Sequence, residues 1–135
     1  MLCALAAMVV GLSGCAGRVE EKQVETEVTP AEVAHDQKTI DQLRAAGSDV
    51  TKPHEIDFYL YFPTEAEAGE AAATLTGRGY RATVRPGADN KNWLCLASKT
   101  MPPTIQNLTE AHGVLKGLAV KYKGDYDGWE TAVQP

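Results

Sequence analysis

Two segments of the chain alternate apolar and polar residues with a period of two. The first segment covers residues 56–62, and its two faces are Ile56, Phe58, Leu60 and Phe62 against Asp57, Tyr59 and Tyr61. The second covers residues 80–85, and its two faces are Tyr80, Ala82 and Val84 against Arg81, Thr83 and Arg85. Such alternation predicts a strand with one buried face. We predict two further strands, at residues 93–98 after a polar turn and at residues 126–133.

Three other segments carry apolar residues at helical spacing. The first begins with Thr29, Pro30 and Glu32, which form a capping box with proline at the first helical position, and it ends at Gly47. The second begins with another capping box, Thr64 and Glu67, and the third follows two prolines and stops at Gly124. Their apolar stripes are Val33, Ile40 and Leu43; Ala68, Ala71, Ala72 and Leu75; and Ile105, Leu108, Ala111, Leu115, Leu118 and Tyr122.

The order of these elements, a helix followed by β-α-β-β-α-β, predicts an α+β fold. Right-handed crossovers place both later helices on one face of a four-stranded antiparallel sheet, which is the ferredoxin-like sandwich, here with an extra N-terminal helix. One domain over residues 30–135 is therefore expected. The core residues that we predict are Leu60, Phe62, Leu75, Leu94, Leu96, Leu108, Leu115 and Leu118.

The opposite face of the sheet is the candidate interaction face. Its predicted residues are Tyr59, Tyr61, Arg81, Arg85 and Trp93. Aromatic and arginine side chains are enriched where proteins bind one another, because they combine large contact area with hydrogen bonding. The alternative is that the N-terminal helix folds over this face, so that the aromatic residues form a second small core.

The N-terminal residues resemble a bacterial lipoprotein signal. An uncharged apolar run from Leu2 to Leu12 ends in Ser13-Gly14-Cys15, and it is too short to cross a bilayer as a helix. The resemblance implies a signal peptide at 1–14, acylation of Cys15 and a membrane anchor, followed by a tether at 15–29. We expect a protein on the periplasmic side of the outer or inner membrane; without a functional signal the protein would be cytoplasmic.

Composition and residue spacing give no support for catalysis or for a bound metal. The sequence contains 13 Lys and Arg residues and 18 Asp and Glu residues, so its net charge is −5. An acidic surface repels nucleic acid. With Cys3 in the signal and Cys15 acylated, Cys95 is expected to be a buried, inert thiol. The histidines, His35, His54 and His112, lack metal-ligand spacing and are expected on the surface. We therefore expect no catalytic residue, cofactor or metal.

Several segments together resemble the regulator of ribonuclease E activity B (RraB) family over about residues 35–133. They are residues 37–43 leading into Gly47-Ser48-Asp49, the strand at 56–62, Gly79-Tyr80, and Tyr126-Asp127-Gly128-Trp129. The last motif is the most specific. For this motif we predict a structural role, in which Gly128 permits a bulge and Trp129 fastens the last strand to the core, with contact to a partner as the alternative.

The resemblance implies a non-catalytic, ferredoxin-like protein that binds ribonuclease E and inhibits it in the cytoplasm. The lipoprotein signal would instead place the domain across the membrane from that nuclease, with an unknown envelope protein as its partner. A peptidoglycan-binding module of the sporulation-related repeat type, which has the same order of elements, is the alternative function. An RNA-recognition module is disfavoured because residues 91–98 lack the required aromatic spacing.

Overall fold

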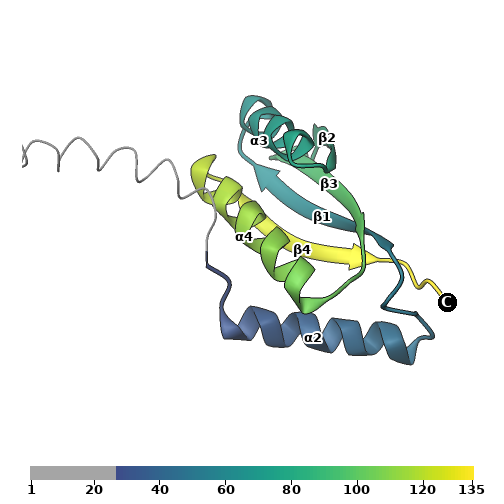
Figure 1. Cartoon of the computed structure of the whole chain (residues 1–135). Helices are drawn as coiled ribbons and strands as arrows, with labels where there is room; N and C mark the ends of the chain where they lie inside the picture. Colours follow the sequence, from purple (N-terminus) through teal and green to yellow (C-terminus); the bar gives the residue numbers. More distant parts are fainter. Residues whose placement is uncertain (1–26) are drawn as a thin grey trace, which may run out of the picture.

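The computed structural model describes residues 27–135 (Figure 1). The predicted signal peptide at 1–14, the acylation site Cys15 and the tether up to residue 26 lie outside the described residues. The elements run in the order α2 (Pro30–Ala45), β1 (His54–Phe62), α3 (Glu65–Gly77), β2 (Arg81–Pro86), β3 (Trp93–Met101), α4 (Ile105–Lys121) and β4 (Asp125–Thr131).

The four strands form one sheet in the order β2-β3-β1-β4, and every neighbouring pair is antiparallel. The central strand β1 pairs with β3 along its whole length, from His54 opposite Met101 to Phe62 opposite Trp93. On its other side β1 pairs with β4. This arrangement confirms the predicted ferredoxin-like α+β fold with a helix before the sheet.

The predicted capping residues begin and end α2 and begin α3. The predicted stop of the last helix at Gly124 was wrong, because α4 ends at Lys121 and the left-handed residue after it is Lys123, at φ +62°. The Thr29 N–H donates to the Glu32 carboxylate at 2.9 Å, and the Glu32 N–H donates to the Thr29 hydroxyl at 3.3 Å, so the first capping box is formed. Thr64 caps α3 in the same way through the Glu67 N–H. Gly47 ends α2 at φ +98°, and the Ser48 N–H bonds back to the Leu43 carbonyl, which is a Schellman motif.

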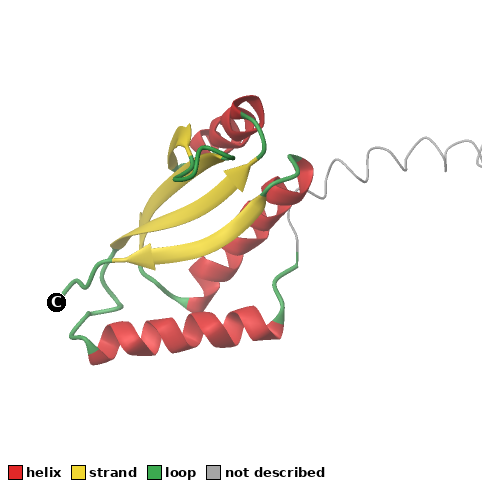
Figure 2. Ribbon diagram, turned by 180° about the vertical axis from the view of Figure 1, so that it is seen from behind, coloured by secondary structure: helices red, strands yellow, loops and turns green. Residues whose placement is uncertain are grey.

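The hydrophobic core lies between one face of the sheet and the helices α3 and α4. Four side chains of β1 are at most 1% exposed, namely Ile56, Phe58, Leu60 and Phe62. The two helices cover them with Ala68, Ala71, Leu75, Leu108, Ala111, Leu115 and Leu118. The predicted alternation of β1 is therefore confirmed. Figure 2 shows the other face of the sheet turned toward the viewer, with the helices behind it and beside it.

The prediction for β3 was wrong about which side chains face the core. Leu94 lies opposite Tyr61 and Leu96 opposite Tyr59, so both leucines belong to the face without helices. Leu94 is nevertheless buried there, with 5% of its surface exposed. Trp93 lies opposite Phe62 and packs against the core, so it does not join the candidate interaction face. Cys95 and Ala97 fill the core positions instead. The segment Trp93–Leu96 is apolar on both faces, and its own pattern therefore does not distinguish them.

Helix α2 packs beside α4 and is linked to β4 by the hydrogen bond between Trp129 and Asp36 (Figure 1). Its buried residues are Asp36, Ile40 and Leu43, and Asp36 bonds to side chains from α4 and from the helix-covered face of β4. The alternative in which this helix covers the open face of the sheet is therefore wrong. Within residues 27–135, no element lies over that face (Figure 2).

No helix in the described part of the chain is both long enough and apolar enough to span a bilayer.

Candidate functional site

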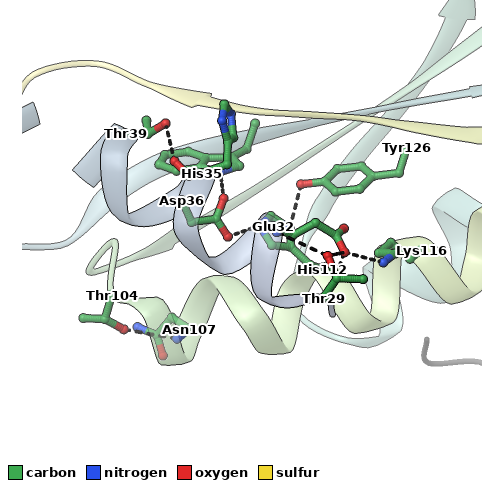
Figure 3. Close-up of polar contacts among 11 residues, drawn as sticks. Thr29, Glu32, His35, Asp36, Thr39, Thr104, Asn107, His112, Lys116 and Tyr126 are labelled. Carbon is green, nitrogen blue, oxygen red and sulfur yellow. Dashed lines mark hydrogen bonds and ion pairs between the residues drawn. The ribbon is translucent and has the colours of Figure 1, made fainter. Parts of the chain in front are cut away.

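A chain of buried polar side chains joins α2, α4 and β4. The His112 Nε2 atom lies 2.7 Å from an Asp36 carboxylate oxygen, and the His112 Nδ1 atom lies 2.8 Å from the Tyr126 hydroxyl (Figure 3). The Trp129 indole N–H donates to the other Asp36 oxygen at 2.9 Å. Asp36 and His112 are only 2% and 3% exposed. We call Asp36, His112, Tyr126 and Trp129 the polar cluster.

One assignment of protons satisfies every contact in the polar cluster. A carboxylate only accepts hydrogen bonds, so the Nε2–H of His112 donates to Asp36. The Nδ1 atom of a neutral imidazole then accepts from the Tyr126 hydroxyl, and Asp36 accepts from Trp129 at its other oxygen. The cluster therefore buries these polar groups without leaving a donor or acceptor unpaired, which is the condition for burying them at low cost.

A β-bulge brings Tyr126 and Trp129 to the same face of β4. Residues three apart in a regular strand point to opposite faces, because side chains alternate. Here Tyr126 lies opposite Leu60 and Trp129 opposite Phe58, with a register shift between them that leaves Asp127 as the extra residue. Gly128 next to it has φ +118°, a conformation that glycine adopts without strain. The bulge, the positive φ of Gly128 and the packing of Trp129 against the core are the features that the predicted structural role of the motif requires.

A pocket of about 420 Å³ lies between α2, α4 and β4, with the polar cluster in its wall. Its lining residues from α2 include Glu32, His35, Asp36 and Thr39. The other side is His112 together with the whole segment Tyr126–Trp129. The family motif from the sequence is thus one wall of the pocket.

Glu32 at the rim of the pocket is held as a carboxylate. The Lys116 ammonium donates to it at 2.8 Å, and the Thr29 N–H donates to it as well (Figure 3). These hydrogen bonds, that from Lys116 first, lower the pKa of Glu32 to about 2. Lys116 thereby ties the start of α2 to α4.

The order Asp36, His112, Tyr126 resembles a catalytic triad with a phenol in place of the usual nucleophile. Burial raises the pKa of the Tyr126 hydroxyl far above its ordinary value, so the phenol stays protonated at neutral pH. A nucleophile needs the opposite shift. Within residues 27–135 there is also no group of three or more His, Cys, Asp or Glu side chains placed to hold a metal ion. The raised pKa of Tyr126 therefore argues against this phenol as a nucleophile.

Comparison with protein families identifies the domain. The model of the family described as regulator of ribonuclease activity B matches residues 33–131, which is most of the chain. The chain belongs to this family. The matched range begins within α2 and ends at the last residue of β4, so it contains the whole polar cluster. A search of curated proteins finds no match.

The Gly47-Ser48-Asp49 element of this regulator of ribonuclease activity B domain fixes the C-terminal segment. The Ser48 hydroxyl lies 2.8 Å from His54 Nε2, and the His54 Nδ1 atom lies 2.7 Å from the Lys52 carbonyl. The Gln134 N–H donates to the Ser48 oxygen at 2.9 Å. A buried Ser-His pair suggests a nucleophile, but this serine is occupied on both sides, and its role is structural.

The open face of the domain carries most of the predicted interaction residues. Tyr59 and Tyr61 lie in its centre with Leu94 and Leu96, and Arg81 and Arg85 lie on the edge strand β2. The Tyr59 hydroxyl donates to Glu130 on β4 at 2.7 Å, and this hydrogen bond raises the pKa of Tyr59 to about 12. Arg81 forms an ion pair with Glu55. The structure thus gathers every predicted residue of this face except Trp93.

Two members of the polar cluster, Asp36 and His112, were not predicted from the sequence. His112 and His54 were expected on the surface, and this prediction was wrong, because both are buried and hydrogen-bonded. Asp36 was not singled out at all. Cys95, in contrast, is buried as expected, and burial raises the pKa of its thiol to about 11.

Proposed function

We propose that the protein is a non-catalytic regulator that binds a protein partner through the open face of its sheet. The observation that carries the proposal is an apolar centre on the sheet face that no helix of residues 27–135 covers (Figure 2). It is formed by the half-buried Tyr59, Tyr61 and Leu96 beside Leu94, which is itself only 5% exposed. The arginines of β2 flank it on one side, and Glu130 of β4 flanks it on the other. An apolar centre with a charged rim is the usual anatomy of a protein interface.

Membership of a family described by regulation of a ribonuclease supports the regulatory part of this proposal. A regulator of this size acts by binding to a surface of its target. The open face supplies the regulator's side of that contact and needs no catalytic group. We propose further that the domain works in the cell envelope, anchored through lipid on Cys15. The support for this location is the Leu12-Ser13-Gly14-Cys15 sequence after an apolar run.

Metabolic labelling tests the anchor. Cells that produce the wild-type chain and are fed labelled palmitate should yield a labelled protein in the membrane fraction. The Cys15→Ala variant should lose the label completely, because the acylated thiol is gone. Cys95→Ala is the matched control and should keep the label, since that thiol is buried in the core. An unlabelled wild-type protein, or label that survives Cys15→Ala, would contradict the anchor.

The compartment decides which protein the domain regulates. A fusion to a reporter that is active only after export should be active for the wild-type signal. Export would exclude direct contact with cytoplasmic ribonuclease E and leave an envelope protein as the partner. Retention inside the cell would instead make ribonuclease E the partner to test first.

Substitution of the open-face tyrosines tests the binding surface. The chain from residue 16 onward contains every core residue of the domain, and it serves as bait. Tyr59→Ala combined with Tyr61→Ala should weaken partner binding about 30-fold, because two interface anchors removed together cost about 2 kcal/mol or more. Val120→Ala, at a side chain on α4 that is 73% exposed, is the control and should bind like wild type.

Two outcomes would contradict the open-face proposal. Partner binding that is unchanged in the double tyrosine variant, with the fold intact by circular dichroism, would move the interface elsewhere. Saturable binding to purified peptidoglycan that both tyrosine substitutions weaken would assign the same face to the peptidoglycan-binding alternative.

A further inference from the structure

We propose that the pocket between α2, α4 and β4 binds an arginine side chain of a partner protein. This inference goes beyond the proposed function, because the pocket lies on the helix-covered side of β4, whereas the open face lies on the other side. Either surface can therefore fail its test while the other passes.

The volume and shape of the pocket suit one long side chain. Its volume of about 420 Å³ lies at the lower end of the range for small-molecule sites, which is about 300 to 1,000 Å³. Ten residues from three elements line it, and the buried members are held in place by the polar cluster. A pocket with walls fixed by hydrogen bonds loses little entropy when it is filled.

The charge of the lining selects a cation. Glu32, Asp36 and Asp127 contribute carboxylates, and His35 and His112 contribute imidazoles. Among the lining residues in the described range 27–135 there is neither lysine nor arginine. Lys116 neutralises Glu32 from outside the pocket, which leaves Asp36 at the wall and the exposed Asp127 beside the bulge. Asp36 is only 2% exposed and its two oxygens already accept from His112 and Trp129, so the exposed Asp127 is the carboxylate that an added cation would contact directly. An added cation would interact favourably with both carboxylates.

The aromatic residues favour a guanidinium over an ammonium. Trp129 and Tyr126 both line the pocket, and tryptophan is the side chain whose face attracts cations most strongly. A guanidinium is planar, stacks on aromatic rings and is more weakly hydrated than an ammonium, so it loses less on entering a partly enclosed pocket. The combination of stacking surface and carboxylates is complementary to arginine.

The two tryptophans of the chain provide a built-in reporter and control. The indole N–H of Trp129 donates to Asp36 inside the site, whereas Trp93 packs against the core opposite Phe62. The experiment titrates the nitrogen-15-labelled chain from residue 16 onward with a capped Gly-Arg-Gly peptide at pH 7. The Trp129 indole resonance should shift and saturate, and the Trp93 resonance should stay in place.

Two matched peptides and two matched variants make the result specific. The citrulline peptide has the same shape without the charge, and it should bind at least about tenfold more weakly; the lysine peptide should also bind more weakly. Asp127→Asn should weaken arginine binding about threefold, as expected for one exposed charge. Asp89→Asn, the same change in the β2–β3 turn, should have no effect.

The remaining outcomes would overturn the proposal. Absence of a saturable shift, movement of Trp93 in step with Trp129, or equal binding of the citrulline or lysine peptide would each do so. Failure of Asp127→Asn to weaken binding would place the peptide outside the pocket. A shift of the Trp129 resonance on replacing Arg18 and Lys22 by glutamine, without peptide, would make the chain's own tether the occupant.

Discussion

Replacing Leu60 by alanine is expected to lower the free energy of unfolding by about 2 to 5 kcal/mol. Leu60 is fully buried at the centre of β1, between the sheet and the helices, so the change removes apolar contacts and leaves a cavity. A small domain has a total stability of about 5 to 15 kcal/mol, and the variant should therefore melt at a much lower temperature. Chemical denaturation followed by circular dichroism measures the difference.

Tyr59→Ala is the control for this experiment, because Tyr59 is the neighbour of Leu60 on the opposite face of the same strand. It removes a larger side chain that is only half-buried and a hydrogen bond to Glu130. Its effect on the melting temperature should be clearly smaller. Equal losses in the two variants would mean that the open face contributes as much to stability as the core does.

Replacing Asp36 by alanine is expected to cost about 2 to 6 kcal/mol, because two buried donors lose their acceptor at about 1 to 3 kcal/mol each. The substitution leaves the Nε2–H of His112 and the indole N–H of Trp129 buried without an acceptor. A buried unpaired donor loses its full hydration without compensation. Urea denaturation of the variant gives the change in unfolding free energy.

Asp41→Ala on the same helix is the matched control. Asp41 is exposed and forms a surface ion pair with Arg44, so its loss should change stability by no more than about 0.5 kcal/mol. The double variant with His112→Ala should destabilise less than the sum of the two single changes, because the contact between the two residues would be counted twice. Additive effects, or an Asp36→Ala variant as stable as Asp41→Ala, would contradict the account of the polar cluster.

Local patterns in the sequence were sufficient to predict the helices and strands and to predict which side chains of β1 face the core. The strand β1 alternates strictly, and the caps Thr29 and Thr64 lie where the helices begin. The strand β3 could not be oriented in the same way, because both of its faces are apolar. Which of Trp93 and Leu94 faces the core depends on the pairing of β3 with β1, a contact between distant parts of the chain.

The polar cluster left a signal in the sequence that is visible once the helices are known. Asp36 lies four residues before Ile40 and seven before Leu43, on the apolar stripe of α2. His112 lies four residues after Leu108 and three before Leu115, on the stripe of α4. A polar residue on the apolar stripe of each of two helices indicates a buried contact. That the contact joins these two helices depends on how they pack, which helical spacing does not encode.

The bulge in β4 makes the presence of a residue at position 127 matter more to the fold than the identity of its side chain. Asp127 is exposed, and its side chain could be exchanged without disturbing the strand. Deleting it would restore regular alternation and move either Tyr126 or Trp129 to the other face, so that one partner of His112 or Asp36 would be lost. Within this domain, insertions and deletions between that tyrosine and that tryptophan should therefore disturb the fold more than substitution of Asp127 does.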